Sequence, residues 1–323
     1  MIALRALLLL VAAGYATAAG AQSYPSRPVT IVVPFSAGGP TDTIARIMAE
    51  RMTRALGTAV VVENNTGAGG SIGVGRVVRA APDGYTLGIG HIGTHVINGV
   101  VYPLPYDLLK DLEPVAMIAT NPQIVVSKNA LPAKDLKEMI AWVKANQDKT
   151  SIGTGGAGTP SHISGVYFQK TTSTTPQIVH YRGSAPAMQD LLAGHIEIIF
   201  DQAANALPQV RTGKIRAYAV TSNTRLLAAP EIPTVDEAGL PGFYMAVWHG
   251  IWVPANTPKA VTARLNAAIV EALADPAVRE RLAGLGQEIP VREQQTPEAL
   301  AAHHKAEIDK WWPVIRTAGI KAE

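Results

Sequence analysis

Two stretches rich in Gly, Ser and Thr stand where the chain could bind an anion. Residues 35–40 (FSAGGP) follow the β-branched run 29–33, and residues 153–160 (GTGGAGTP) follow another strand pattern; a helical pattern comes after each stretch. Glycine lets the backbone approach a ligand, and a helix N-terminus offers unpaired N–H groups with a partial positive charge. These loops therefore predict an anion site made of backbone amides and hydroxyl groups. The alternative is an ordinary βα turn of an α/β domain.

Four larger side chains could complete such a site. Arg182 comes directly after a strand pattern, where a guanidinium suits a carboxylate, although a surface ion pair is the common alternative. Asp201 ends another strand pattern and could bind a ligand hydroxyl or amine, or hold a neighbouring loop. Trp248 and His249 lie in an expected strand whose side chains face either a cleft or the core. We predict that all four contact a ligand.

A serine hydrolase is the serious enzyme alternative. Residues 69–73 match GxSxG around Ser71, and Asp201 and His249 follow in the order of a hydrolase triad. The nucleophile of that motif stands directly at a strand end, whereas residues 64–68 intervene here, and no HGGG-type oxyanion motif is present. We therefore expect no catalytic residue and no enzyme activity, with Ser71 as a helix cap. A secreted serine hydrolase that uses Ser71 stays the alternative.

Cofactor and metal motifs are incomplete. Residues 88–93 and 153–158 match GxGxxG, but neither lies in the first βαβ unit and the second has no acidic residue about 20 positions on. His91 and His95 are four apart, but Ile92 stands where a HExxH zinc peptidase has its catalytic Glu. We expect neither a cofactor nor a metal.

The N-terminus has the pattern of a cleavable export signal. Arg5 precedes the apolar run 6–13, and Ala19-Gly20-Ala21 resembles a cleavage site, which predicts a signal peptide over residues 1–21. The absence of Cys rules out a lipoprotein anchor and disulfides, and no later run is long enough to span a bilayer. With a net charge of +3 and no Lys/Arg cluster, a nucleic-acid surface is not expected. The predicted location is the periplasm.

Strand-like and helical runs alternate along most of the chain, as in α/β proteins. We predict one domain from residues 22–121 plus 252–323 and a second from 122–251, with hinge crossings near 121 and 250. In this arrangement, strands 113–120 and 123–127 are separated at Asn121-Pro122, and both Gly-rich loops face the cleft between the domains.

Four motifs occur in order along the chain: PFSAGGPTDTIAR, AAPDGYTL, GTGGAGTPSHISG and YRGSAPAMQDLLAGHIEIIFD. With them the chain resembles the substrate-binding proteins of tripartite tricarboxylate transporters, often called Bug receptors. The resemblance implies a type II-like periplasmic binding fold, in which two lobes of mainly parallel sheet flanked by helices are joined by two crossing strands. Such a receptor closes like a Venus flytrap around an organic acid and delivers it to a membrane permease. It also implies that the two loops hold a carboxylate through Ser36, Ala37, Gly38, Gly39, Thr41, Thr154, Gly155, Thr159 and Ser161.

Two features bear on the ligand. Arg182 stands where the family often has Lys, and Trp248-His249 lie in a segment that varies with ligand. A basic fork and an aromatic residue at the far end of the cleft suit a rigid second carboxylate, so an aromatic dicarboxylate such as terephthalate is the hypothesis. Aliphatic dicarboxylates, citrate and acidic amino acids remain open. The partner is a permease or, alternatively, a signalling protein, and we expect a monomer.

Overall fold

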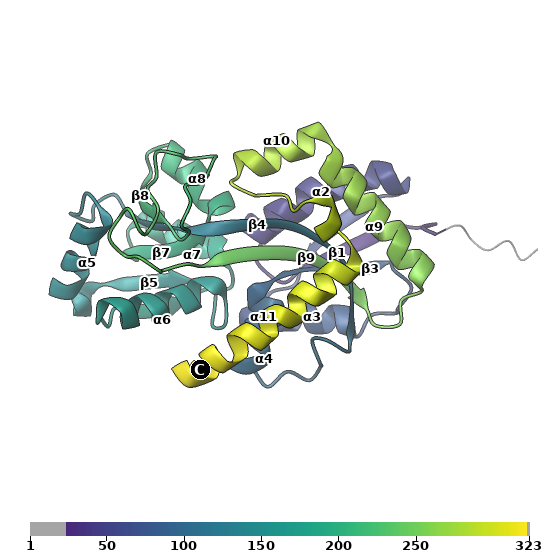
Figure 1. Cartoon of the computed structure of the whole chain (residues 1–323), viewed down its shortest axis with the longest axis horizontal. Coiled ribbons are helices and arrows are strands. Elements are labelled where there is room, and N and C mark those ends of the chain that lie inside the picture. Colours follow the sequence, from purple (N-terminus) through teal and green to yellow (C-terminus); the bar gives the residue numbers. More distant parts are fainter. Residues whose placement is uncertain (1–23, 322–323) are drawn as a thin grey trace, which may run out of the picture.

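The computed structural model describes residues 24–321. Strands and helices alternate through its first two thirds, and helices dominate the last third (Figure 1). The strands are β1 (Val29–Val33), β2 (Val60–Asn64), β3 (Thr86–His91), β4 (Leu112–Lys128), β5 (Ser151–Thr154), β6 (Gln177–His180), β7 (Ile198–Gln202), β8 (Ile215–Val220) and β9 (Ala246–Pro254). The helices are α2 (Pro40–Leu56), α3 (Ser71–Val78), α4 (Asn98–Val101), α5 (Leu136–Ala145), α6 (Pro160–Thr172), α7 (Ser184–Ala193), α8 (Ala203–Arg211), α9 (Lys259–Ala274), α10 (Pro276–Gly284) and α11 (Pro297–Ala318), with short turns η1 (Ala68–Gly70), η2 (Gly93–Ile97), η3 (Gln147–Lys149) and η4 (Arg292–Gln294).

The strands of this range follow the order β2-β1-β3-β9-β4-β7-β5-β6, with β8 on β4. The outer pairs at each end are parallel, whereas β3/β9, β4/β9, β4/β7 and β4/β8 are antiparallel. The first lobe consists of β1 to β3 with α2 to α4 and α9 to α11, and the second of β5 to β8 with α5 to α8. Figure 1 shows β4 and β9 running side by side from one lobe to the other. The predicted two-lobed α/β fold is confirmed.

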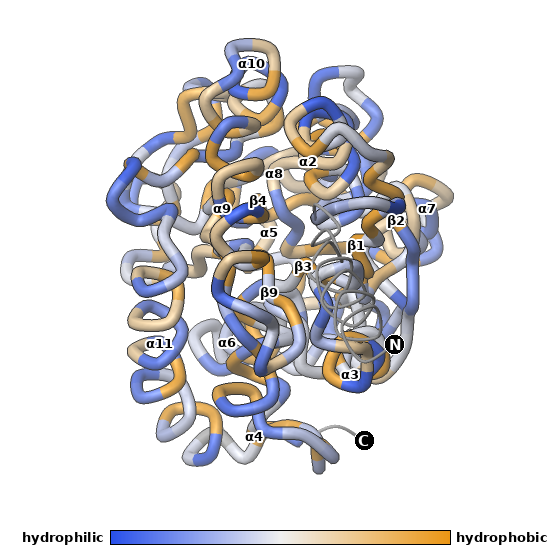
Figure 2. The backbone as a smooth tube through the Cα atoms, turned by 90° about the vertical axis from the view of Figure 1, so that its right-hand side faces the viewer, coloured by the Kyte–Doolittle hydropathy of each residue, from blue (hydrophilic) through white to orange (hydrophobic). Residues whose placement is uncertain are grey.

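Each lobe has its own hydrophobic core. Strand β1 (VTIVV) is buried along most of its length, because β2 and β3 lie on either side of it and helices cover both faces of the sheet. Its residues pack with α2 and α9 in the first lobe, whereas the second half of β4 packs with α5, α7 and α8 in the second. Figure 2 shows hydrophobic and hydrophilic segments alternating along α11, as in a helix with one face against the protein. Burial of these residues therefore explains the strand-like and helical spacing of hydrophobic residues in the sequence.

Strand β4 corrects one detail of the sequence prediction. Residues 112–128 form one strand of 17 residues, not two strands separated at Asn121-Pro122. Pro122 pairs with Ala246 of β9, and from Gln123 onward β4 pairs with β7 instead. Proline lacks a backbone N–H, and here this missing donor falls where the strand changes partners, so the ladder continues. The domain boundaries proposed from the sequence stay a prediction.

The predicted signal peptide, residues 1–21, lies outside the described residues. Within residues 24–321, no helix combines the length and apolar character needed to cross a bilayer.

Candidate ligand-binding site

The two Gly-rich loops have nearly the same local structure. Gly38 and Gly158 both adopt left-handed φ values, of 78° and 74°. Each donates its N–H to a side chain four residues later, Gly38 to Asp42 Oδ2 (2.8 Å) and Gly158 to His162 Nδ1 (3.1 Å). The local sequence produces this turn in each lobe, because glycine tolerates the left-handed region and the side chain in the first helical turn closes the loop.

Both loops end in a helix that begins with proline. Gly39 and Thr159 are the N-cap residues of α2 and α6; Gly39 has no side chain, and the Thr159 hydroxyl accepts no hydrogen bond from a backbone N–H of α6. Pro40 and Pro160 occupy the first helical turns, where the missing N–H costs nothing. The next N–H groups of each helix remain available to an external acceptor.

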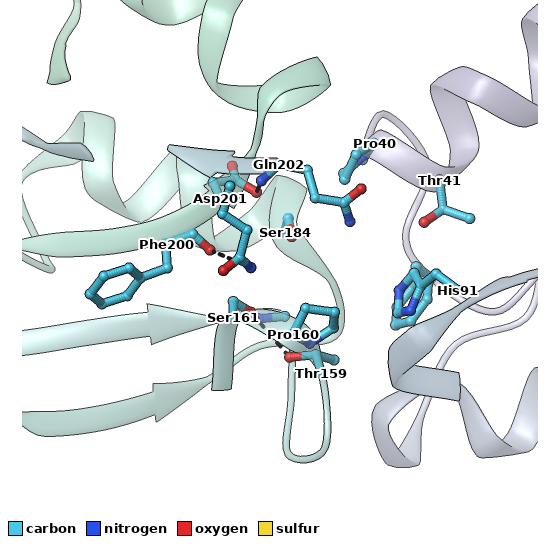
Figure 3. Close-up of a pocket in the computed structure, with 14 residues that line it drawn as sticks. Pro40, Thr41, His91, Thr159, Pro160, Ser161, Ser184, Phe200, Asp201 and Gln202 are labelled. Carbon is cyan, nitrogen blue, oxygen red and sulfur yellow. Dashed lines mark hydrogen bonds between the residues drawn. The ribbon is translucent and has the colours of Figure 1, made fainter. Parts of the chain in front are cut away.

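A cavity between the lobes is surrounded by the starts of four helices (Figure 3). Gly39 to Thr41 begin α2 on the first-lobe side, Thr159 to Ser161 begin α6, Ser184 begins α7, and Gln202 is the N-cap of α8. All four helices exceed two turns, so each presents a positive dipole end to the same space. No Lys or Arg is among the described residues that line it. The arrangement can therefore hold an anion through dipoles, amides and hydroxyls.

The structure brings together six of the residues predicted to bind ligand. Those that line the cavity are Gly39, Thr41, Gly155, Thr159, Ser161 and Asp201. Ser36, Ala37, Gly38 and Thr154 belong to the same two loops but are not among its lining residues. Thr154 instead bonds His180 Nδ1 (2.7 Å) and accepts the Gly156 N–H, so it stabilises the second loop from behind.

Three other predicted ligand residues lie away from the cavity lining. Arg182 has an exposed side chain on the segment before α7 and makes no ion pair with the described residues. Trp248 is buried and donates its indole N–H to Glu307 of α11 (3.2 Å). His249 is fully buried behind Thr41, with its Nε2 3.3 Å from the Thr41 hydroxyl. Its contact with the ligand would therefore be indirect, through Thr41.

Several lining residues were not expected from the sequence. They are Phe35, Pro40, His91, Gln123, Pro160, Ser184, Phe200 and Gln202. Pro40, Pro160 and Ser184 were recoverable, because each begins a helix directly after a glycine-containing loop. Gln123 was not, because it became a lining residue only when β4 proved continuous and crossed between the lobes. Phe35 adds aromatic surface beside the polar loops, whereas the Phe200 ring points away from the cavity and packs on Phe168 and Phe243 in the second-lobe core (Figure 3).

Asp201 is an acid at the centre of this anion-binding arrangement. Its carboxylate accepts the Gln202 N–H (2.8 Å) and the Asn205 amide (2.5 Å), and burial raises its pKa to about 7 despite these bonds. Near neutral pH a large fraction of Asp201 is therefore protonated and can donate a hydrogen bond to a ligand oxygen. Asp42 behaves differently: burial opposes its ionisation, but bonds from Arg46, Gly38 and Asn64 lower its pKa.

The hydrolase arrangement is not assembled in this structure. Ser71 is the first residue of α3, whose N-cap is Gly70, so the prediction that Ser71 caps a helix is wrong. The Asn98 amide donates to its Oγ (3.1 Å), whereas His249 bonds Thr41, and Asp201 bonds Gln202 and Asn205. In the part of the chain that the structure describes, no group of three or more His, Cys, Asp or Glu side chains is placed to hold a metal ion.

The lobes touch directly beside the cavity. The Tyr102 hydroxyl of the first lobe donates to the Ala157 carbonyl of the second (2.9 Å). Gly69 lies so close to Ala157 that a Cβ at position 69 would overlap its carbonyl oxygen, and a Cβ at Gly158 would overlap Asn98. These glycines allow the close approach of the two backbones.

Comparisons of sequence and of structure with known proteins point to the same protein family. The sequence profile described as "Tripartite tricarboxylate transporter family receptor" matches residues 44–320. The periplasmic binding protein BugD is similar in structure, with a TM-score of 0.90 and 40% identity over 93% of this chain and 100% of that one. MatC from Rhodopseudomonas palustris with bound malate has a TM-score of 0.87 and 40% identity, covering 90% and 100% of the two chains. Another R. palustris protein, with adipate, has a TM-score of 0.87 and 32% identity, covering 93% and 100%. The chain therefore belongs to the receptor family of the tripartite tricarboxylate transporters.

Proposed function

We propose that this protein is a periplasmic receptor that captures an organic carboxylate between its lobes, without catalysis, and delivers it to a tripartite tricarboxylate-type membrane transporter. The observation that carries the proposal is the convergence of four helix N-termini on one cavity that no Lys or Arg lines. Several N–H groups and dipoles can share the charge of one carboxylate there. The similar proteins with malate and adipate support the same ligand class.

The protein groups that would surround the rest of the ligand favour a dicarboxylate. Phe35 offers apolar surface for the body of the ligand, and Asp201 can donate a hydrogen bond when protonated. Arg182 would reach a second carboxylate from the cleft edge. An aromatic dicarboxylate such as terephthalate fits this division into polar and aromatic surfaces, and malate and adipate are the aliphatic alternatives.

Thermal-shift measurements test the ligand class. The protein from Gln22 onward would be screened with malate, adipate, succinate and terephthalate, and then titrated by isothermal calorimetry. An acid present at 100 times its dissociation constant stabilises the folded state by about 2.7 kcal/mol. Failure of every organic anion to stabilise the protein would contradict the proposal.

The role of Arg182 is tested with two ligands of equal chain length. Arg182→Gln should weaken adipate binding more than hexanoate binding, because only adipate has the second carboxylate. Arg225→Gln is the matched control, since Arg225 is also in the second lobe but pairs with Glu237 on the surface. Equal losses for both acids would contradict a contact between Arg182 and the second carboxylate.

The proposed partner and location are tested in cells. N-terminal sequencing of the exported protein should begin at Gln22, and deletion of the receptor should abolish uptake of the bound acid by the transporter. Normal uptake with an altered signalling response would instead favour the sensor alternative.

A further inference from the structure

His91 lies at the end of β3, directly opposite His249 of β9 in the sheet register. It is 2% exposed and lines the cavity from the first-lobe side, across from Pro160 (Figure 3). Its backbone N–H bonds the Thr94 hydroxyl (3.0 Å), and the π-helical turn η2 follows at Gly93. Turns of this type are rare and often occur at functional sites.

Neighbouring groups fix the orientation of the His91 ring. Phe35 stacks on one face with its centroid 4.9 Å away, and His249 meets the ring edge-on at 5.5 Å. Gly93 closes the remaining side, since a Cβ there would lie 2.6 Å from His91 Cε1 and 2.9 Å from Pro160 Cδ. The ring therefore has little freedom to turn when a ligand arrives.

The hydrogen bonds also determine which nitrogen carries the proton. The Gly93 N–H donates to His91 Nδ1 (2.9 Å), so Nδ1 must be unprotonated. Burial lowers the pKa of His91 to about 3, and the neutral ring therefore has its proton on Nε2. Within residues 24–321, Nε2 makes no hydrogen bond. Because His91 lines the cavity, its Nε2–H is open to an acceptor supplied from outside the chain.

We propose that His91 contacts the ligand and that its Nε2–H donates a hydrogen bond to a carboxylate oxygen of the bound acid. This inference rests on the proposed function, because it requires an organic acid in the cavity. It adds a neutral, rigid donor to the dipoles and amides of the two loops. No proton changes place, so His91 acts as a recognition group throughout.

Substitution of His91 gives the first test. His91→Phe keeps an aromatic ring against Phe35 but removes the donor, whereas His91→Gln restores an N–H near the Nε2 position. Calorimetric titration with malate, succinate and adipate should show at least tenfold weaker binding by His91→Phe and a smaller loss for His91→Gln. His195→Gln, at an exposed histidine, is the matched control and should bind like the wild type.

The tautomer can be observed in the unmodified protein. A long-range ¹H–¹⁵N spectrum of the eight histidines should show His91 as the Nε2–H form, identified by its loss in His91→Phe. Addition of malate should shift the Nε2–H proton downfield, as expected for a new hydrogen bond to a carboxylate. The tautomer and the ligand-induced shift are measured on the wild type, and only the assignment of the signal uses His91→Phe.

The outcomes separate this inference from the proposed function. If the wild type binds none of the acids, the proposed function fails and the inference fails with it. If the wild type binds and His91→Phe binds within twofold of it, or if His91 is the Nδ1–H form, only the inference is overturned. A loss for malate but not for succinate would assign the contact to the malate hydroxyl and would overturn the carboxylate assignment.

Discussion

Gly183 of the second lobe lies directly against Ser36 of the first. A Cβ on Gly183 would overlap Ser36 Oγ and lie 3.1 Å from the Ser36 backbone nitrogen. The Ser36 hydroxyl is buried there without a hydrogen-bond partner in the described chain. Position 183 therefore limits how closely the loop before α7 can approach the first Gly-rich loop.

Gly183→Ala should oppose closure of the lobes. Strain on the order of 1–3 kcal/mol in the closed form would weaken ligand binding roughly 5- to 150-fold. Calorimetry gives the affinity, and small-angle scattering shows whether saturating ligand still compacts the protein. Gly194→Ala is the control, because Gly194 also has a positive φ (83°) but no atom within 4 Å of its Cβ position. Wild-type affinity in Gly183→Ala would contradict this account.

Tyr102→Phe should weaken ligand binding without a large loss of stability. Its hydroxyl bonds Ala157 across the lobes, so removal costs about 1 kcal/mol only in the closed form, or about fivefold in dissociation constant. Tyr106→Phe is the matched control, since the Tyr106 hydroxyl bonds Ser71 within the first lobe (3.0 Å). Calorimetry and thermal unfolding should separate the two: Tyr106→Phe lowers the melting temperature but leaves the affinity unchanged. Equal effects of both variants on affinity would refute the distinction.

Affinity for adipate should fall as the pH rises from 6 to 8. The pKa of Asp201 is raised to about 7, so its protonated, hydrogen-bond-donating form predominates at pH 6 and is lost at pH 8. If only that form binds the dianion, the dissociation constant increases roughly tenfold over this range. Both adipate carboxylates are mainly ionised over this range, and the pKa of the lining His91 is far lower, at about 3. Asp201→Asn should make the affinity independent of pH; a persistent slope in that variant would exclude Asp201 as its origin.

The free energy of unfolding should decrease as the pH falls from 6.5 towards 4. Burial lowers the pKa of His91 to about 3 and of His162 and His304 to about 4, while His95 and His249 also lie well below their usual value. Below pH 6.5 the unfolded chain therefore binds protons that the folded protein excludes, at about 1.4 kcal/mol per pH unit for each group. Burial lowers the pKa of His303 as well, and Asp201 opposes the trend, because its raised pKa favours the folded state at low pH, but it is one group against six.

Urea unfolding at pH 7, 6 and 5 measures this slope. His304→Gln should flatten it by about one proton, because the buried imidazole that bonds the His95 carbonyl no longer titrates. The exposed His195→Gln variant should leave the slope unchanged. A stability that does not depend on pH in the wild type would show that these histidines are protonated in the folded state.

The local parts of the site were predictable from the sequence. Residues 35–40 and 153–160 form the expected turns, because Gly, Pro and the side chain four positions later determine a helix start within a few residues. The four ordered motifs identified the family. The alternation of strand and helix patterns predicted the architecture, because the spacing of hydrophobic residues in each segment reflects which of its faces is buried.

Which side chains face the ligand was decided only by the tertiary structure. His91, Gln123 and Asp201 reach one cavity from three strands far apart in sequence, whereas Arg182 stays exposed and Trp248 packs against α11. Strand β4 shows why: Pro122 marks where it changes partners from β9 to β7, but no local pattern shows which of its side chains then face the cavity. Sequence determines how each segment folds. The lining of a cleft depends on how two lobes approach, and that depends on contacts between residues far apart in the sequence, such as Tyr102 with Ala157 and Ser36 with Gly183.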